Sequence, residues 1–255
     1  MNELLKMTAH QVKEGKFDKV ILAIGSCEAH GQHLAEGCDT IVSYELSKQV
    51  ADRVPGMLVL PPITVGYSGH YDTFPFTLTF DYETMIHVIY DIVESVLRNG
   101  INKIFLMNGH DGNIAPIEIA ARKIKEKYPD ARIASLPEWW VIAGKLVPEG
   151  TFAVWNGLGH AGEGETSIAY HLFPQWCEPD QATCVVPDHL PEHVDIKWDF
   201  AEITDTAQTG DATVATAAKG KLMNACLVEA VVKDIEALEK TGWNYNTSHC
   251  ATKLK

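Results

Sequence analysis

The segment ILAIGSCEAHGQHLAEGCD, residues 21–39, begins as an apolar strand and ends in side chains that could bind a metal or carry a proton. These side chains are Glu28, His30, His33, Glu36 and Asp39. Glu28 and His30 are two residues apart, so in an extended segment they point the same way, and Gly31 lets the chain turn directly afterwards. Two carboxylates and an imidazole suit a divalent ion such as Zn²⁺, Mn²⁺ or Fe²⁺. The alternative is a polar loop in which Asp39 caps a helix and His30 is solvated.

A second motif, NGHDGN at residues 108–113, follows the apolar stretch KIFLM. Its two glycines permit a tight turn at which His110 and Asp111 can face a ligand. The simpler interpretation is a strand-to-helix turn with Asp111 or Asn113 as the helix cap. A position at the end of a strand favours a site role for His110, because ligands bind at the carboxyl ends of parallel strands.

A third motif, HAGEGETS at residues 160–167, places a histidine and two glutamates at the start of a predicted helix. Unpaired amides at a helix start favour anions, so Glu163 and Glu165 could also serve only the helix dipole. Seven groups from the three motifs could converge on one or two divalent ions. They are Glu28, His30, Asp39, His110, His160, Glu163 and Glu165.

Apolar runs and amphipathic stretches alternate along the chain and predict the elements that position these motifs. We expect strands at 19–25, 57–63, 103–109, 131–137 and 182–187, and helices at 40–54, 81–100, 114–128, 165–173 and 211–240. Because parallel strands need crossovers and bury both faces, this order predicts one α/β domain with a mostly parallel central sheet and helices on both faces. We expect the domain to span 1–240, with 241–255 as a loosely held tail.

Length and composition limit the class of protein. The chain has 255 residues, 46% of them hydrophobic, which is enough to bury a full core. Its formal net charge of −13 repels phosphate backbones and anionic lipid, so neither nucleic acid nor a membrane is an expected partner. We expect a cytoplasmic protein, since no segment resembles a signal peptide or a membrane span. Six scattered cysteines without a CxxC pair are expected to be reduced.

Four segments together resemble one known family. GSCEAHGQHLAEGCD, GYSGHYDTFP, NGHDGN and HAGEGETS, in this order and at these separations, are similar to the creatininase (creatinine amidohydrolase) family. The resemblance covers roughly residues 18–230. It implies an α/β enzyme, often a hexamer, with two divalent ions per subunit, in which metal-activated water attacks a C–N bond of a small cyclic or formylated amide.

The resemblance also implies roles for single residues. In family terms, Glu28 and His110 would bind one metal, His30 would bind the other, and Asp39 would bridge the two. His160 matches the family's catalytic histidine. An imidazole titrates near neutral pH and can pass a proton to the departing nitrogen.

The sequence departs from creatininase itself at two places. Creatininase has a metal-binding glutamate two residues after the NGH histidine, where this chain has Gly112. We expect Glu163 to supply the missing carboxylate, with Glu165 as the alternative. Creatininase also stacks its substrate between two tryptophans; Trp139 matches one of them, and Asn156 stands at the other position. The loss of an aromatic contact makes creatinine a doubtful substrate.

The remaining substrate-binding candidates are His70 and Tyr71, in the segment 66–77 that resembles one wall of the family's pocket, and Asp111. The alternative for 66–77 is a structural loop with packed aromatic residues. Few Lys or Arg residues stand near the motifs, which favours a neutral or weakly charged polar substrate over a phosphorylated one.

The sequence therefore predicts a metal-dependent hydrolase of an amide or formamide C–N bond in a small molecule, with His160 as proton donor and acceptor. One alternative is hydrolysis of a C–C bond that opens a keto-cyclitol (inosose) ring, and another is creatinine hydrolysis itself. A third is a non-catalytic metal-binding protein. His160 argues against that third alternative, because a storage site needs no proton donor.

Overall fold

The computed structural model describes residues 2–188, 193 and 197–244. Its centre is a four-stranded parallel sheet in the order β2-β1-β3-β4. The strands are β1 (Lys19–Ile24), β2 (Met57–Val59), β3 (Lys103–Asn108) and β4 (Arg132–Leu136). All six residues of β1 are buried, as expected for an inner strand covered on both faces. Ile24 pairs with Asn108, so β1 and β3 end side by side.

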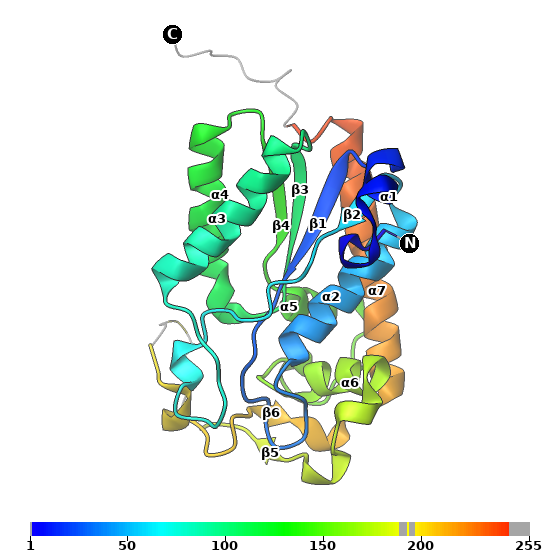
Figure 1. Cartoon of the computed structure of the whole chain (residues 1–255). Coiled ribbons are helices and arrows are strands. Elements are labelled where there is room, and N and C mark those ends of the chain that lie inside the picture. The colour runs from blue at the N-terminus through cyan, green and yellow to red at the C-terminus, as the bar shows by residue number, and fades with distance from the viewer. Residues whose placement is uncertain (1, 189–192, 194–196, 245–255) are drawn as a thin grey trace.

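Helices cover both faces of the sheet (Figure 1). The helices are α1 (Ala9–Glu14), α2 (Cys38–Arg53), α3 (Tyr82–Arg98), α4 (Ile114–Lys127), α5 (Trp139–Leu146), α6 (Glu163–Leu172) and α7 (Ala217–Lys240). The helices α3 and α4 pack together on one face. On the other face α2 packs against β1, and α7 packs against α2, α5 and α6.

The two faces follow from the alternation of side chains along β1. Val20 and Leu22 belong to the same hydrophobic cluster as Ile89 of α3. Ile21 points the opposite way and belongs to the cluster that contains Leu46 of α2. The predicted fold class, a single α/β domain with helices on both faces of a parallel sheet, is confirmed.

The strand predicted at 182–187 is not part of the central sheet. Only β5 (Cys184–Val185) forms there, and it pairs antiparallel with β6 (Gly210–Asp211). Cys184 is exposed and Val185 half-buried, whereas an inner parallel strand is buried on both faces. Hydrophobic periodicity over so few residues does not distinguish these cases.

Two other element boundaries differ from the sequence prediction by more than two residues. The last helix begins at Ala217 and not at 211, because the Thr216 side chain accepts a hydrogen bond from the Lys219 backbone and caps the helix there. The strand predicted at 57–63 ends at Val59, before the dipeptide 61–62, whose two prolines have no N–H for a ladder.

The C-terminal boundary at 240 remains a prediction. Trp243 is buried, and its indole N–H donates to Glu239; residues 245–255 lie outside the described part. The five described cysteines are free, and Cys250 is not described. Within the described ranges, no helix is both long enough and apolar enough to cross a bilayer.

Candidate active site

The loop after β1 brings three of the predicted ligands together. Glu28 and His30 are fully buried and Asp39, in the first turn of α2, is 2% exposed. Gly31 has a φ of +63°, which lets the chain turn back after His30. The Nδ1 of His30 lies 3.1 Å from the backbone oxygen of Glu28, and its Nε2 lies 3.0 Å from the Asp39 carboxylate. The carbonyl thus orients the ring, and Nε2 is the atom that could bind a cation.

His110 reaches the same carboxylates from the end of β3. Its Nδ1 lies 3.1 Å from Oε1 of Glu28 and 3.2 Å from Oδ2 of Asp39. Its Nε2 lies 2.8 Å from the backbone oxygen of Tyr67, which accepts the hydrogen bond. A metal-binding histidine commonly donates its other ring N–H in this way, so Nδ1 is free to bind a cation.

The ligand atoms form overlapping sets. One set is Glu28, Asp39 and His110, another is His30, Asp39 and Glu165, and a third is Glu28, His30 and His160; within each set the atoms lie within 4.8 Å of one another. Asp39 belongs to the first two sets, as a bridging ligand would. The oxygens Oε1 of Glu28 and Oδ2 of Asp39 are buried and accept no hydrogen bond. Unsatisfied carboxylate oxygens at the centre of such sets fit a divalent cation.

The carboxylates and imidazoles of the cluster shift one another's pKa values toward the charged forms. Burial by itself lowers the pKa of His30, but the Asp39 carboxylate outweighs it and raises that pKa to about 10. Burial likewise raises the pKa of Asp39, but His30 and His110 outweigh it and hold that pKa below its usual range. The carboxylates therefore attract positive charge strongly, and protons and a cation compete for the site.

Of the two glutamates in HAGEGETS, the structure places Glu165 at the cluster and Glu163 away from it. Glu163 accepts a hydrogen bond from the backbone of Ala153, 2.6 Å away, and forms an ion pair with Lys219. Glu165 lies with His30 and Asp39. Two residues along a helix correspond to a turn of about 200°, so neighbouring glutamates face opposite sides. Burial raises the pKa of Glu165 to about 7, so an adjacent cation would favour its ionised form.

The glutamate that is absent at Gly112 could not be accommodated there. A Cβ on Gly112 would lie 2.1 Å from the backbone oxygen of Tyr67 and 2.6 Å from Nε2 of His110. The close approach that orients His110 therefore requires a glycine at this position.

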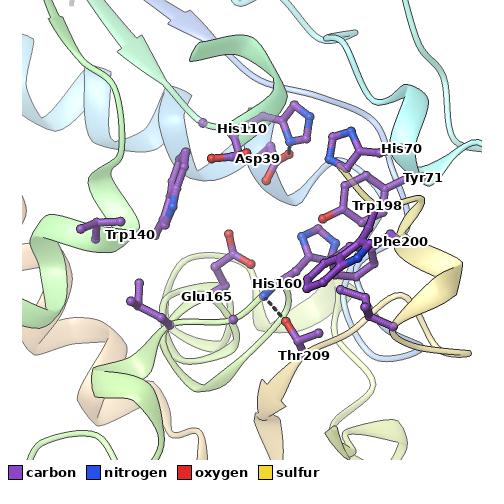
Figure 2. Close-up of a pocket in the computed structure, with 16 residues that line it drawn as sticks. Asp39, His70, Tyr71, His110, Trp140, His160, Glu165, Trp198, Phe200 and Thr209 are labelled. Atoms are coloured by element: carbon purple, nitrogen blue, oxygen red, sulfur yellow. Dashed lines mark hydrogen bonds and ion pairs between the residues drawn. The ribbon is translucent and has the colours of Figure 1, made fainter. Parts of the chain in front are cut away.

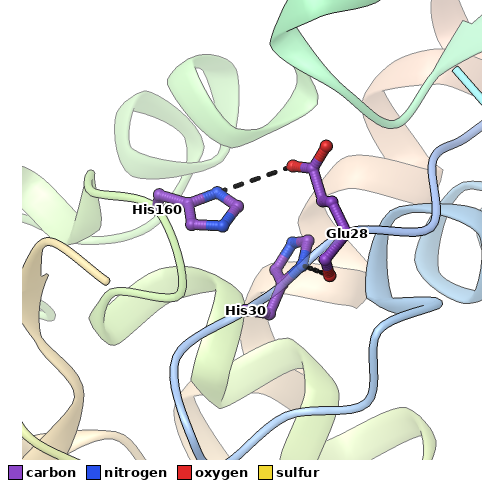
Figure 3. Close-up of side chains that lie close together, drawn as sticks. All are labelled: Glu28, His30 and His160. Atoms are coloured by element: carbon purple, nitrogen blue, oxygen red, sulfur yellow. Dashed lines mark hydrogen bonds and ion pairs between the residues drawn. The ribbon is translucent and has the colours of Figure 1, made fainter. Parts of the chain in front are cut away.

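His160 lies beside the ligand sets (Figure 3). Its Nε2 lies 2.7 Å from the backbone oxygen of Ala29, its Nδ1 lies 3.9 Å from Oε1 of Glu28, and its ring centroid is 4.2 Å from that of His30. Burial and the neighbouring His30 lower the pKa of His160 to about 3, so the ring is neutral at pH 7. With Nε2 donating to Ala29, Nδ1 is the basic atom that faces the site.

These groups open into a pocket of about 410 Å³ (Figure 2). Three of the four predicted substrate-binding residues line it, namely His70, Tyr71 and Asp111. Trp139 does not: it is 1% exposed and packs in the hydrophobic core, and the next residue, Trp140, lines the pocket instead. Successive helical residues face different directions, which the PEWW segment alone does not resolve.

One wall of the pocket is formed by residues that no sequence motif singled out. Trp198, Phe200 and Ile203 line the pocket, and the Phe200 ring lies 4.5 Å from the ring of Tyr71. In Figure 2 the Asp39 and Glu165 carboxylates lie between Trp140 on one side and Trp198 on the other. The two aromatic residues of the run WDF at 198–200 were the available signal, but their rings carry no metal-binding or proton-transfer group. None of the described pocket residues is Lys or Arg.

Fold and site together define an α/β protein with a candidate divalent-metal centre at the carboxyl edge of its sheet. A family model described as "Creatininase: Creatinine amidohydrolase" matches residues 5–235. The chain is 28% identical over 231 residues to a creatinine amidohydrolase of Pseudomonas putida, covering 85% of this chain and 88% of that protein. It is 26% identical over 245 residues to a mycofactocin precursor peptide peptidase of Mycobacterium ulcerans (strain Agy99), covering 92% and 91%.

Solved structures agree with these sequence matches. A structure named "Creatininase Mn" has a TM-score of 0.77 and 26% identity and covers 92% of this chain and 98% of its own. A mutant creatininase of Zn–Zn type has a TM-score of 0.76 and 27% identity and covers 92% and 97%. The chain belongs to the creatininase family and is a hydrolase of that family.

Proposed function

We propose that the protein is a divalent-metal-dependent hydrolase that cleaves an amide or formamide C–N bond in a small, polar, uncharged molecule. The observation that carries this proposal is the position of Asp39, shared by two ligand sets, with Nδ1 of His160 facing the same carboxylates. Family membership supports hydrolysis, and the donor chemistry supports a cation.

Glu28, Asp39 and His110 would hold one cation, and His30, Asp39 and Glu165 a second. When bound, a divalent cation in such a site polarises a carbonyl and lowers the pKa of water. The mixture of carboxylate and imidazole donors suits Zn²⁺, Mn²⁺ or Fe²⁺. Solved relatives whose names include Mn and Zn favour those two ions.

His160 would handle the proton. Its Nε2 hydrogen bond to Ala29 leaves Nδ1 to accept a proton from the side of the carboxylates and to release it to the departing nitrogen. Burial and the neighbouring His30 lower the pKa of His160, so the ring is neutral at pH 7 and Nδ1 is free to accept a proton.

The pocket supports a compact, uncharged substrate. The pocket residues that the structure describes include acidic, imidazole and aromatic side chains but no Lys or Arg, so among them a phosphate or carboxylate group would lack a cationic partner. A flat group could lie between Trp140 and Trp198, with His70, Tyr71 and Asp111 as polar or aromatic contacts.

Creatinine is the second candidate substrate, favoured by the two tryptophans on opposite sides of the pocket and by the match to a creatinine amidohydrolase. Trp140 and Trp198 would then take the place of the two substrate-stacking tryptophans of creatininase, whose positions in this chain are Trp139 and Asn156. Hydrolysis of a keto-cyclitol stays a prediction, which an inosose in the substrate panel tests.

For the setting of the enzyme, we propose a homo-oligomer, a hexamer by family resemblance, in the cytoplasm, without nucleic-acid or membrane partners. The support for association is an exposed apolar group next to the pocket wall: Phe76 is 85% exposed at a strained φ of +55°, and Leu78 and Tyr82 are also exposed. Light scattering of the pure protein measures the number of subunits.

The experiment that tests the function is metal removal and restoration with a substrate panel. The protein is stripped with a chelator, reloaded with Zn²⁺, Mn²⁺ or Fe²⁺, and assayed on N-formyl amines, lactams, creatinine, an inosose and a phosphorylated formamide. We expect metal-dependent release of amine or ring opening from an uncharged amide. Turnover that is indifferent to chelation, or confined to the inosose or the phosphorylated compound, contradicts the proposal.

A further inference from the structure

Thr209 is bonded to the backbone of His160 in both directions. The His160 N–H donates to Oγ1 of Thr209 at 3.0 Å, and the Thr209 N–H donates to the His160 carbonyl at 2.9 Å. Figure 2 shows the first of these bonds at the floor of the pocket. Thr209 is 8% exposed, so water competes little for either bond.

Glycines allow this contact. A Cβ on Gly159, whose φ is +119°, would lie 2.4 Å from the Thr209 carbonyl, and a Cβ on Gly162 would lie 2.9 Å from the same oxygen. From the facing segment, a Cβ on Gly210 would lie 2.9 Å from the carbonyl of Leu158. The two backbones therefore pack against each other with no room for side chains, which explains the glycines at these three positions.

The residue after His160 is strained. Ala161 has a φ of +49°, a conformation that costs a non-glycine residue of order 1 kcal/mol or more. Its N–H donates to the carboxylate of Glu165 at 2.7 Å. Such a conformation persists only where its surroundings over-determine it. Glu165 and the Thr166 hydroxyl, which donates to the Ala161 carbonyl at 3.0 Å, restrain Ala161 itself, and Thr209 adds two bonds to the preceding residue.

The segment that contains Thr209 also holds the metal-binding loop. The carbonyl of Ala207 accepts a hydrogen bond from the N–H of Gly31, at 2.8 Å, directly after His30. The ring end of His160 is held to the same loop by Ala29. The stretch 207–210 thus links the histidine backbone to the loop that carries Glu28 and His30.

We propose that Thr209 is a positioning residue for the proposed hydrolysis: it holds His160 so that Nε2 stays on the Ala29 carbonyl and Nδ1 faces the carboxylates. This inference rests on the proposed function for its kinetic consequence, but the geometry it asserts can be measured without a substrate. The residue acts through His160, and its own hydroxyl exchanges no proton with the substrate.

The test compares Thr209→Val, which keeps the shape and loses the hydroxyl, with Thr209→Ser, which keeps the hydroxyl. Thr204→Val is the matched control, because Thr204 is also buried and, among the described residues, its hydroxyl bonds to the hydroxyl and the backbone N–H of Thr206, which does not line the pocket. Crystal structures of the Zn²⁺-loaded proteins report the separation of His160 Nε2 and Ala29 oxygen. Steady-state kinetics on the best substrate of the panel report kcat and KM.

In Thr209→Val we expect the Nε2 to oxygen distance to exceed about 3.5 Å, and kcat to fall about 10- to 100-fold at an unchanged KM and metal content. Thr209→Ser should retain the distance and a kcat within about threefold, and Thr204→Val should retain both. An unmoved His160 ring in Thr209→Val overturns the proposal, as does an equal loss in Thr209→Ser or a fall in kcat that follows metal content. If the wild-type protein shows no metal-dependent turnover, the proposed function is overturned instead. The crystal structures then still show whether Thr209 holds the His160 ring in place.

Discussion

Glu163 and Glu165 lie two residues apart in the first turn of α6, and their carboxylates face different parts of the molecule. Glu165 lies with His30 and Asp39, whereas Glu163 pairs with Lys219 of α7 and with the backbone of Ala153. The first position is suited to binding a cation, and the second ties the loop before His160 to the last helix. The two glutamates therefore have separable roles.

Glu165→Gln should lower metal affinity by at least about 100-fold, since removing an outer-shell partner already costs 10- to 100-fold. Glu163→Gln, the matched control, should keep the metal and lose about 1–3 kcal/mol of unfolding free energy, because a buried hydrogen-bonded ion pair is broken. Calorimetric titration with Zn²⁺ and urea unfolding measure the two effects. If Glu163→Gln lost metal and Glu165→Gln did not, Glu163 would be the metal ligand, as the sequence predicted.

Asp39→Asn should remove both cations, because Asp39 belongs to both ligand sets and its neutral amide binds a cation poorly. We expect bound metal, measured by elemental analysis after dialysis, to fall below one ion per ten subunits, with turnover falling in step. His160→Gln should keep its metal and lose about 10²- to 10⁴-fold in kcat. Loss of metal in His160→Gln would show instead that His160 is a ligand.

Gly112→Ala should displace the Tyr67 carbonyl, since a Cβ there would lie 2.1 Å from that oxygen. His110 then loses the partner of its Nε2, and metal affinity should fall about 10- to 100-fold. For the same reason, Gly112→Glu should not rescue Glu165→Gln in the Zn²⁺ titration. Ala115→Gly, on an exposed turn of the neighbouring helix α4, serves as the control for a changed backbone. Rescue by the double variant would contradict this steric explanation.

His33 should make stability depend on pH. Burial and the neighbouring His30 lower its pKa to about 4 from 6.5, and its Nε2 bonds to Thr166. Because the folded pKa is the lower one, its contribution is full above pH 6.5 and is lost as the pH falls from 6.5 through 4. Between these limits the loss is at most about 3 kcal/mol.

His33→Gln removes this titration, so the stability difference between wild type and variant should shrink as the pH falls from 7 to 4.5. Urea unfolding in the presence of chelator measures it, and the exposed His10→Gln is the control. If the stability difference between wild type and His33→Gln stays constant from pH 7 to 4.5, the lowered pKa of His33 is contradicted.

Trp198→Ala should weaken substrate binding. Loss of an aromatic face costs about 1.5 kcal/mol, or roughly tenfold in KM, while kcat changes little because the indole is not placed to transfer a proton. Trp176, 56% exposed and absent from the pocket lining, provides the control variant Trp176→Ala. An unchanged KM for the uncharged amide substrate would place that substrate away from this wall.

Most of the fold and part of the site follow from local sequence. The apolar run of β1 and the amphipathic helices predict a parallel sheet, since their periodicity depends only on near neighbours. The same holds for Glu28, His30 and Asp39, which one loop brings together after β1. The motif NGHDGN adds His110, because β3 pairs beside β1 in register and ends at the same edge.

Tertiary structure alone decided the rest. The choice between Glu163 and Glu165, and between Trp139 and Trp140, depends on how one helix is rotated against its neighbours, and packing of the whole core sets that rotation. Thr209 and Trp198 reach the site from segments outside the four motifs that resemble the family, so no local pattern marks them. Their roles arise from contacts between residues about 40 or more positions apart, and a sequence pattern records side chains without recording what they touch.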